Sequence, residues 1–81
     1  MTRLPRDLSG RDLAVLLRRL GYEITRQTGS HIRLTTAAKG EHHLTVADHK
    51  CLRVGTVAGI LAEVAAHLGM NADALRERLF E

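Results

Sequence analysis

Residues 22–35 read Tyr-Glu-Ile-Thr-Arg-Gln-Thr-Gly-Ser-His-Ile-Arg-Leu-Thr, and this stretch decides the fold. Apolar and polar residues alternate on both sides of Thr28-Gly29-Ser30, which is typical of two β-strands joined by a turn. Gly29 is free to adopt the positive φ that a tight turn requires. The stretch therefore predicts a β-hairpin with strands at 22–27 and 31–35, and it places His31 at the mouth of that hairpin.

The alternation also predicts which side chains of the hairpin face the core, because successive residues of a strand point to opposite faces. The side chains expected to face the core are Tyr22, Ile24, Ile32 and Leu34. The side chains expected on the opposite, open face are Glu23, Thr25, Gln27, His31 and Arg33.

A third strand is predicted at 42–46, after a looser turn at 36–41 that contains Lys39-Gly40. Leu44 and Val46 would face inward, and His43 and Thr45 outward. If the turn closes an antiparallel hairpin, Leu34 faces Leu44, Arg33 faces Thr45, and His43 faces Thr35. His43 then lies about 13 Å along the strand from His31. The same register brings the connecting loop 47–53, with Asp48, His49 and Lys50, toward His31 instead.

Three helices surround these strands. The first is predicted at 10–20, with Ser9 as N-cap, Asp12 three residues later, and Gly21 as the exit. Its apolar stripe comprises Leu13, Leu16, Leu17 and Leu20. The stripe of the second helix comprises Val57, Ile60, Leu61, Val64 and Leu68, followed by Gly69. The opposite side of that helix carries small residues, namely Gly59, Ala62 and Ala66, with Glu63. Asn71 caps a short third helix at 72–80, which packs through Leu75 and Leu79.

These elements predict an α+β fold of the order α-β-β-β-α with an extra short C-terminal helix. A three-stranded antiparallel meander this small must cover one sheet face with both main helices to bury its apolar residues. We expect residues 1–81 to form a single domain. The other sheet face stays open.

Composition narrows the possible functions. One cysteine, Cys51, allows no internal disulfide and suits a reducing cytoplasm. The first ten residues hold three charged side chains and a proline, Pro5, that keeps the leader Met1–Leu8 out of helix; they do not resemble a signal peptide. The net charge of +3 permits a polyanionic partner. Tyr22 and Phe80 are the only aromatic residues, so the sheet cannot stack single-stranded bases on aromatic rings.

Five histidines make metal binding the first hypothesis to test. His42 and His43 are adjacent in a strand and point to opposite faces, so they cannot share an ion. No carboxylate or thiolate stands at ligand spacing to complete a tetrahedral site. Ser30 and His31 are also neighbours that point apart, which disfavours a serine nucleophile. The sequence therefore predicts neither a metal site nor a cofactor.

General acid–base chemistry at His31 remains. Cleavage of RNA needs a base to take the 2′-hydroxyl proton and an acid to protonate the leaving oxygen. Histidine suits both roles, because its ordinary pKa of about 6.5 leaves both forms populated near neutral pH. The alternative is that His31 is merely a solvated side chain of an exposed strand.

Several short segments in this order and spacing resemble the HicA toxin (YcfA-like) family. The segments are Leu8–Leu13, Gly21-Tyr22, Gly29-Ser30-His31, Leu44-Thr45-Val46 with His49, Gly55-Thr56-Val57 and Ile60-Leu61. The resemblance covers about Ser9 to Leu68. Ala47 replaces a proline common in the family, and Leu68–Glu81 extends past the usual core.

This resemblance implies a double-stranded-RNA-binding-like fold and an endoribonuclease that cleaves mRNA as the toxin of a type II toxin–antitoxin pair. A HicB-like antitoxin would be its partner and would cover the active site. The histidine after Gly-Ser, here His31, would be catalytic. Residues expected to bind RNA are Gly29, Ser30, Arg33, Lys39, His49 and Lys50.

Two alternatives stay open. One is a non-catalytic double-stranded-RNA-binding module, which the α-β-β-β-α order also suits. Such modules usually carry a dense basic cluster where the second helix begins, and only Lys50 and Arg53 stand there. The other is an adaptor that binds a protein through the small-residue side of the second helix.

Overall fold

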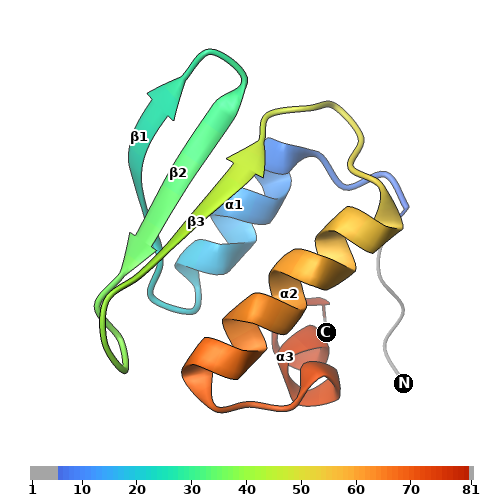
Figure 1. The fold of residues 1–81 in the computed structure, drawn as a ribbon. Coiled ribbons are helices and arrows are strands. Elements are labelled where there is room, and N and C mark those ends of the chain that lie inside the picture. Colours follow the sequence, from blue (N-terminus) through green and yellow to red (C-terminus); the bar gives the residue numbers. More distant parts are fainter. Residues whose placement is uncertain (1–5, 81) are drawn as a thin grey trace.

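The computed structural model describes residues 6–80 (Figure 1). Its elements are α1 (Gly10–Arg18), β1 (Glu23–Thr28), β2 (His31–Thr36), β3 (His42–Ala47), α2 (Val54–Leu68) and α3 (Ala72–Phe80). The predicted order of helix, three strands, helix and short helix is confirmed. The prediction for Pro5 and the start of the leader lies outside the described residues.

The start of α1 follows the predicted capping pattern. The Ser9 hydroxyl accepts a hydrogen bond from the Asp12 backbone N–H at 3.0 Å. The helix ends at Arg18, two residues before the predicted end at residue 20. Gly21 has a φ of +98°, and the Tyr22 N–H bonds back to the Leu17 carbonyl at 3.3 Å. A tight turn therefore replaces the last predicted residues of the helix and leads directly into β1.

The sheet has the order β1-β2-β3, and both pairs of strands are antiparallel. The predicted register between the second and third strands is confirmed: Leu34 pairs with Leu44, Arg33 with Thr45 and Thr35 with His43. The first hairpin closes through a two-residue turn, Gly29-Ser30, and Gly29 has a φ of +54°. Two-residue loops favour glycine where φ is positive, because an L side chain is strained there.

A β-bulge in β1 changes the faces predicted for this strand. Ile24 pairs with Leu34, but the next pair is Arg26 with Arg33, so Thr25 is an extra residue without a partner in β2. Gln27 then pairs with Ile32 and lies on the helix-covered face. The prediction that Gln27 lies on the open face was wrong, because the extra residue shifts the alternation by one position. For the same reason Arg26 reaches the open face.

Both main helices lie on one side of the sheet, and the core lies between the helices and the strands (Figure 1). Helix α1 crosses all three strands, while α2 lies beyond β3 and packs on α3. The largest fully buried side chains are Tyr22, Leu13, Leu17, Ile32, Leu34, Leu61, Leu75, Val46, Val57 and Val64. All elements except β1, whose Ile24 is only partly buried, therefore contribute fully buried side chains to one core.

Helix α2 begins at Val54, three residues before the predicted stripe, and ends at Gly69, which has a φ of +69°. Asn71 caps α3 as predicted, because its side-chain oxygen accepts from the Ala74 N–H at 2.7 Å. Leu75 and Leu79 are buried. The segment after residue 68 therefore completes the core. No single helix within residues 6–80 is long and apolar enough to cross a membrane. Only α2 and α3 counted together have that length and composition, and a bend of 109° separates them.

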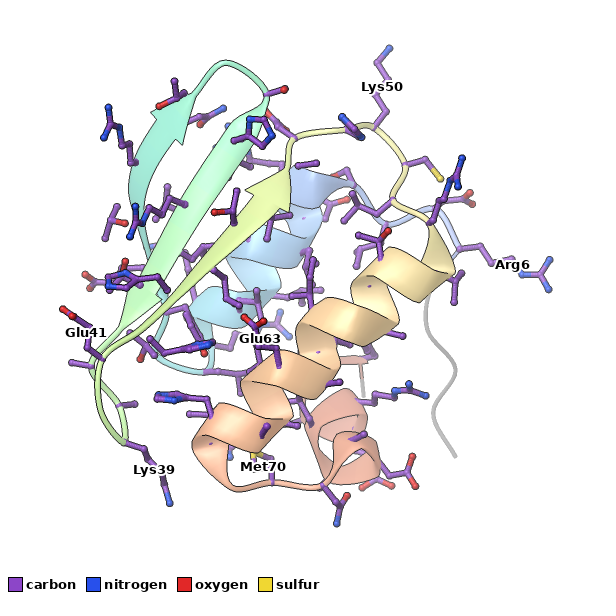
Figure 2. The ribbon with its side chains drawn as sticks, in the orientation of Figure 1. Arg6, Lys39, Glu41, Lys50, Glu63 and Met70 are labelled. Atoms are coloured by element: carbon purple, nitrogen blue, oxygen red, sulfur yellow. The ribbon has the colours of Figure 1, made fainter. Side chains whose placement is uncertain are left out.

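A polar cluster joins the sheet to α2. The Tyr22 hydroxyl and His42 Nδ1 lie 2.7 Å apart, and His42 Nε2 lies 3.4 Å from the Glu63 carboxylate, which points toward the sheet in Figure 2. The His42 ring stacks on His67, with centroids 4.5 Å apart. His67 Nε2 in turn contacts the Ala38 and Gly40 carbonyl oxygens at 2.8 and 3.0 Å. Burial, and then the nearby Glu63 carboxylate, raises the pKa of the Tyr22 hydroxyl above its ordinary value of 10.0.

Candidate active site

His31 is the first residue of β2 and follows directly after the Gly29-Ser30 turn. Its side chain is exposed on the open sheet face and forms no hydrogen bond with the rest of the described chain. Its cross-strand neighbours are Thr28 on β1 and Ala47 on β3. Ser30 also forms no side-chain bond with it. The ring is therefore free to meet a ligand that approaches the sheet.

The next row of the open face is cationic. Arg26 on β1 lies directly opposite Arg33 on β2, and Thr45 completes the row on β3. Like charges in directly opposite positions of a sheet repel each other. Within residues 6–80, neither arginine forms an ion pair with a carboxylate. Two guanidinium groups beside an exposed imidazole form a surface that fits an anion such as a phosphodiester.

Arg26 is the site residue that sequence analysis missed. By simple alternation it belongs with Tyr22 and Ile24 on the buried face, and only the bulge at Thr25 carries it to the open face. One signal was present in the sequence: an arginine at a core-facing position of a small protein is costly to bury. An irregularity in the strand before residue 26, which shifts the inward–outward alternation by one position, would have removed this conflict.

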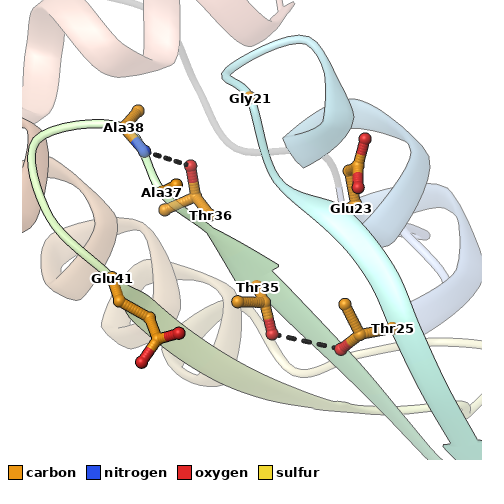
Figure 3. Close-up of a pocket in the computed structure, with 8 residues that line it drawn as sticks. All are labelled: Gly21, Glu23, Thr25, Thr35, Thr36, Ala37, Ala38 and Glu41. Atoms are coloured by element: carbon orange, nitrogen blue, oxygen red, sulfur yellow. Dashed lines mark hydrogen bonds between the residues drawn. The ribbon is translucent and has the colours of Figure 1, made fainter.

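The open face has the opposite character at its other end. Glu23, Thr35 and His43 form the last row across the sheet. His43 Nε2 lies 3.5 Å from the Glu41 carboxylate, and its Nδ1 lies 2.8 Å from the Thr35 hydroxyl. A shallow hollow at this end is lined by both glutamates and by three threonines, two of which, Thr25 and Thr35, contact each other at 3.1 Å (Figure 3). The face is therefore basic near His31 and acidic away from it.

The loop after β3 starts beside His31, as the register predicted. The Asp48 N–H donates to the Ser30 carbonyl at 2.6 Å, which ties the loop to the hairpin turn. His49 and Lys50 follow and are exposed. Figure 2 shows Lys50 extending from this end of the molecule. A hollow next to the loop is lined by Ala47, His49, Cys51, Leu52, Arg53 and Thr56.

Lys39 is not brought to His31. It lies in the turn between β2 and β3, with a φ of +56°, and Figure 2 shows it at the end of the molecule opposite Lys50. The length of β2, five steps of about 3.3 Å or about 17 Å, separates the two ends. Of the other predicted residues, Gly29 and Ser30 directly precede His31, and Arg33 follows it on the same face. His49 and Lys50 lie in the loop that begins at Ala47, the strand partner of His31. Among residues 6–80, no three His, Cys, Asp or Glu side chains gather as metal ligands would.

Fold and site together define a class: a small α+β protein of the order α-β-β-β-α with a short C-terminal helix, and with one sheet face open and basic at one end. The chain belongs to the HicA toxin family, because the family described as "HicA toxin of bacterial toxin-antitoxin" matches residues 10–65. It is thus a toxin of a bacterial toxin–antitoxin system. The match stops within α2, so α3 lies outside it. Comparisons with curated proteins and with solved structures found no match.

Proposed function

We propose that this toxin is a metal-independent endoribonuclease that cleaves mRNA with His31 as an acid–base residue, and that a HicB-like antitoxin neutralises it. The observation that carries the proposal is the position of His31, exposed beside two arginines that form no ion pair with a carboxylate of residues 6–80. The 81 residues would act as one toxin domain.

The proposed chemistry is a transfer within the RNA chain, in which a 2′-hydroxyl is the nucleophile. A neutral imidazole takes the proton of the 2′-hydroxyl, and the 2′-oxygen attacks the neighbouring phosphorus. The bond from phosphorus to the 5′-oxygen breaks, and an acid protonates that oxygen. The products are a 2′,3′-cyclic phosphate and a 5′-hydroxyl, without consumption of water or electrons.

The residues around His31 would bind the RNA backbone. Arg26 and Arg33 would neutralise the phosphate whose charge rises during attack. The turn at Gly29-Ser30 presents backbone groups without bulky side chains. His49 would contact the phosphodiester that His31 meets, and Lys50 would contact the next phosphate. Lys39, at the far end of the molecule, would contact phosphates further along the RNA.

The test compares wild type with His31→Ala for growth arrest on induction and for cleavage of RNA in EDTA. We expect His31→Ala to lose about 100-fold or more in cleavage rate, as for loss of an acid–base group. His43→Ala is the matched control, because His43 lies on the same open face but at its acidic end. Equal toxicity and cleavage in the His31 variant would refute the assignment.

Purified wild-type protein and RNA also distinguish the nuclease from the rival function, a non-catalytic RNA-binding module. A non-catalytic module would bind duplex RNA tightly and with strong salt dependence, but would leave it intact. The start of α2 offers only Lys50 and Arg53 as basic groups, which is a sparse surface for binding without chemistry. Intact RNA after incubation with purified wild-type protein would favour the module over the nuclease.

A further inference from the structure

The acid–base chemistry proposed above requires a second group, because one histidine cannot take the 2′-hydroxyl proton and supply the leaving-group proton at the same moment. We propose that His49 is this second group, and that a side-chain bridge of Arg11, Gln27 and Asp48 holds it beside the phosphodiester that His31 meets. The inference rests on the proposed nuclease function and deepens it.

Backbone geometry brings His49 within reach of His31. His31 and Ala47 are directly opposite in an antiparallel pair, so their Cα atoms lie about 4.5–5.5 Å apart. His49 follows Ala47 by two residues, so the Cα atoms of His31 and His49 lie at most about 13 Å apart. The hydrogen bond from the Asp48 N–H to the Ser30 carbonyl keeps the chain beside the hairpin at this point. Two imidazoles so placed can approach one phosphodiester from different sides.

A hollow beside His49 leaves room for the substrate. Its lining includes Arg53 and Thr56, which belong to the start of α2, together with Ala47, the strand partner of His31. The side chain of Arg53 makes no capping bond to the first turn of α2, so the first N–H groups of that helix have no side-chain partner there. A phosphate in this hollow would meet a guanidinium, a hydroxyl and helix N–H groups next to His49.

The bridge fixes the loop that carries His49. Arg11 Nη2 donates to the Gln27 side-chain oxygen at 2.7 Å, and Gln27 Nε2 donates to the Asp48 carboxylate at 3.1 Å. The Arg11 guanidinium also lies 3.7 Å from that carboxylate. One side chain of β1 thereby connects α1 to the loop after β3. Because the bulge turns Gln27 toward the helices, its side chain lies off the face that would bind RNA.

Helix α1 holds the same loop through its backbone. The Gly10 N–H donates to the His49 carbonyl at 2.9 Å. A Cβ at residue 10 would overlap the Ala47 carbonyl oxygen and lie 3.1 Å from the Asp48 Cα, so helix and loop are in direct backbone contact. The main chain of the loop is therefore held from two sides, at Asp48 by the hairpin turn and at His49 by α1.

The experiment measures RNA cleavage by the purified chain across pH. If one group must be neutral and the other protonated, the rate falls on both sides of an optimum. We expect His49→Ala to lower the cleavage rate about 100-fold, as for removal of an acid or a base. The pH–rate profile of this variant should also lose one limb, which is its fall on one side of the optimum. His43→Ala is the control and retains both limbs.

The bridge is tested by variants that keep both histidines. We expect Gln27→Met, which matches the length of glutamine but cannot bridge, to lower kcat about tenfold with KM unchanged and to flatten the limb that His49→Ala removes. Asp48→Ala should have the same effect as Gln27→Met. Asp48→Asn keeps an oxygen that accepts from Gln27, so its kcat should stay within about twofold of wild type. Amide hydrogen exchange at Asp48 and Gly10 should quicken in Gln27→Met, and this readout does not depend on activity.

The outcomes separate the two proposals. Absence of cleavage by wild type overturns both. Cleavage that His31→Ala abolishes while His49→Ala keeps both limbs overturns the role of His49 and leaves the nuclease intact. A full-rate Gln27→Met variant with unchanged amide exchange overturns the role of the bridge. A folded state comparable with wild type, checked by circular dichroism, accompanies every variant.

Discussion

The contact between α1 and the loop after β3 predicts that Gly10→Ala is strongly destabilising, although alanine is the better helix former. A Cβ at residue 10 would lie 2.8 Å from the Ala47 carbonyl carbon and would overlap its oxygen. Real Cβ atoms essentially never approach a heavy atom of a residue distant in the chain within 3.0 Å. Since both neighbours are backbone atoms, neither can rotate away, and helix and loop must separate.

The magnitude follows from three contributions. Overpacking of this kind costs about 3 kcal/mol at the upper end of its usual range. Loss of the hydrogen bond between the Gly10 N–H and the His49 carbonyl adds about 1 kcal/mol. The better helix propensity of alanine offsets about 1 kcal/mol. The net loss is about 3 kcal/mol, which lowers the Tm of a domain of this size by about 12–24 °C.

Gly59→Ala is the matched control. Gly59 lies in the middle of α2 and is exposed, and apart from the adjoining backbone of α2 no heavy atom of residues 6–80 lies within 4 Å of an added Cβ. This substitution should stabilise the protein by about 0.5–1 kcal/mol. Thermal and urea unfolding followed by circular dichroism measure both variants. If Gly10→Ala unfolds at the same midpoint as wild type or above it, the inferred backbone contact is wrong.

Two further predictions concern the core and its polar cluster. Tyr22→Phe removes the hydroxyl that contacts His42 and should cost about 1–2 kcal/mol, measured by urea unfolding near neutral pH. Because the folded-state pKa of Tyr22 is raised, the contribution of its protonated hydroxyl is complete below pH 10.0 and is lost as pH rises through the folded pKa. Wild type should therefore lose more stability than Tyr22→Phe between pH 9 and the onset of alkaline unfolding, and parallel curves would contradict the shift. Leu75→Ala in α3 should lower the free energy of unfolding by about 2–5 kcal/mol. Leu16→Ala is the control and should lower it clearly less, because Leu16 is half-buried. Equal urea midpoints for Leu75→Ala and wild type would show that α3 is not part of the core.

The sequence predicted the hairpin well because its signals are local. Gly29 marks the turn, and Ile32 and Leu34 show the phase of β2, which then fixes the pairing with Leu44 and Val46. The position of His31 beside the loop 47–53 followed from that register alone. The caps at Ser9 and Asn71 were also visible, because a cap is recognised from three or four neighbouring residues.

The phase of β1 could not be predicted in the same way. After Ile24 the strand continues with Thr25, Arg26, Gln27 and Thr28, all polar, so no apolar residue reveals which side faces the core. The bulge, the outward position of Arg26 and the inward position of Gln27 are decided by packing against α1 and β2. Likewise, the approach of Gly10 to Ala47 joins segments far apart in the sequence and leaves no local pattern.

The bulge at Thr25 also affects how copies of this protein behave at high concentration. Strand β1 is at an edge of the sheet, where unpaired backbone groups can recruit a strand from another molecule. An extra residue in such a strand breaks the regular spacing of those groups and increases the local twist, and the outward Arg26 adds charge at the same place. The irregularity that completes the basic row beside His31 therefore also protects this edge from intermolecular β-sheet pairing.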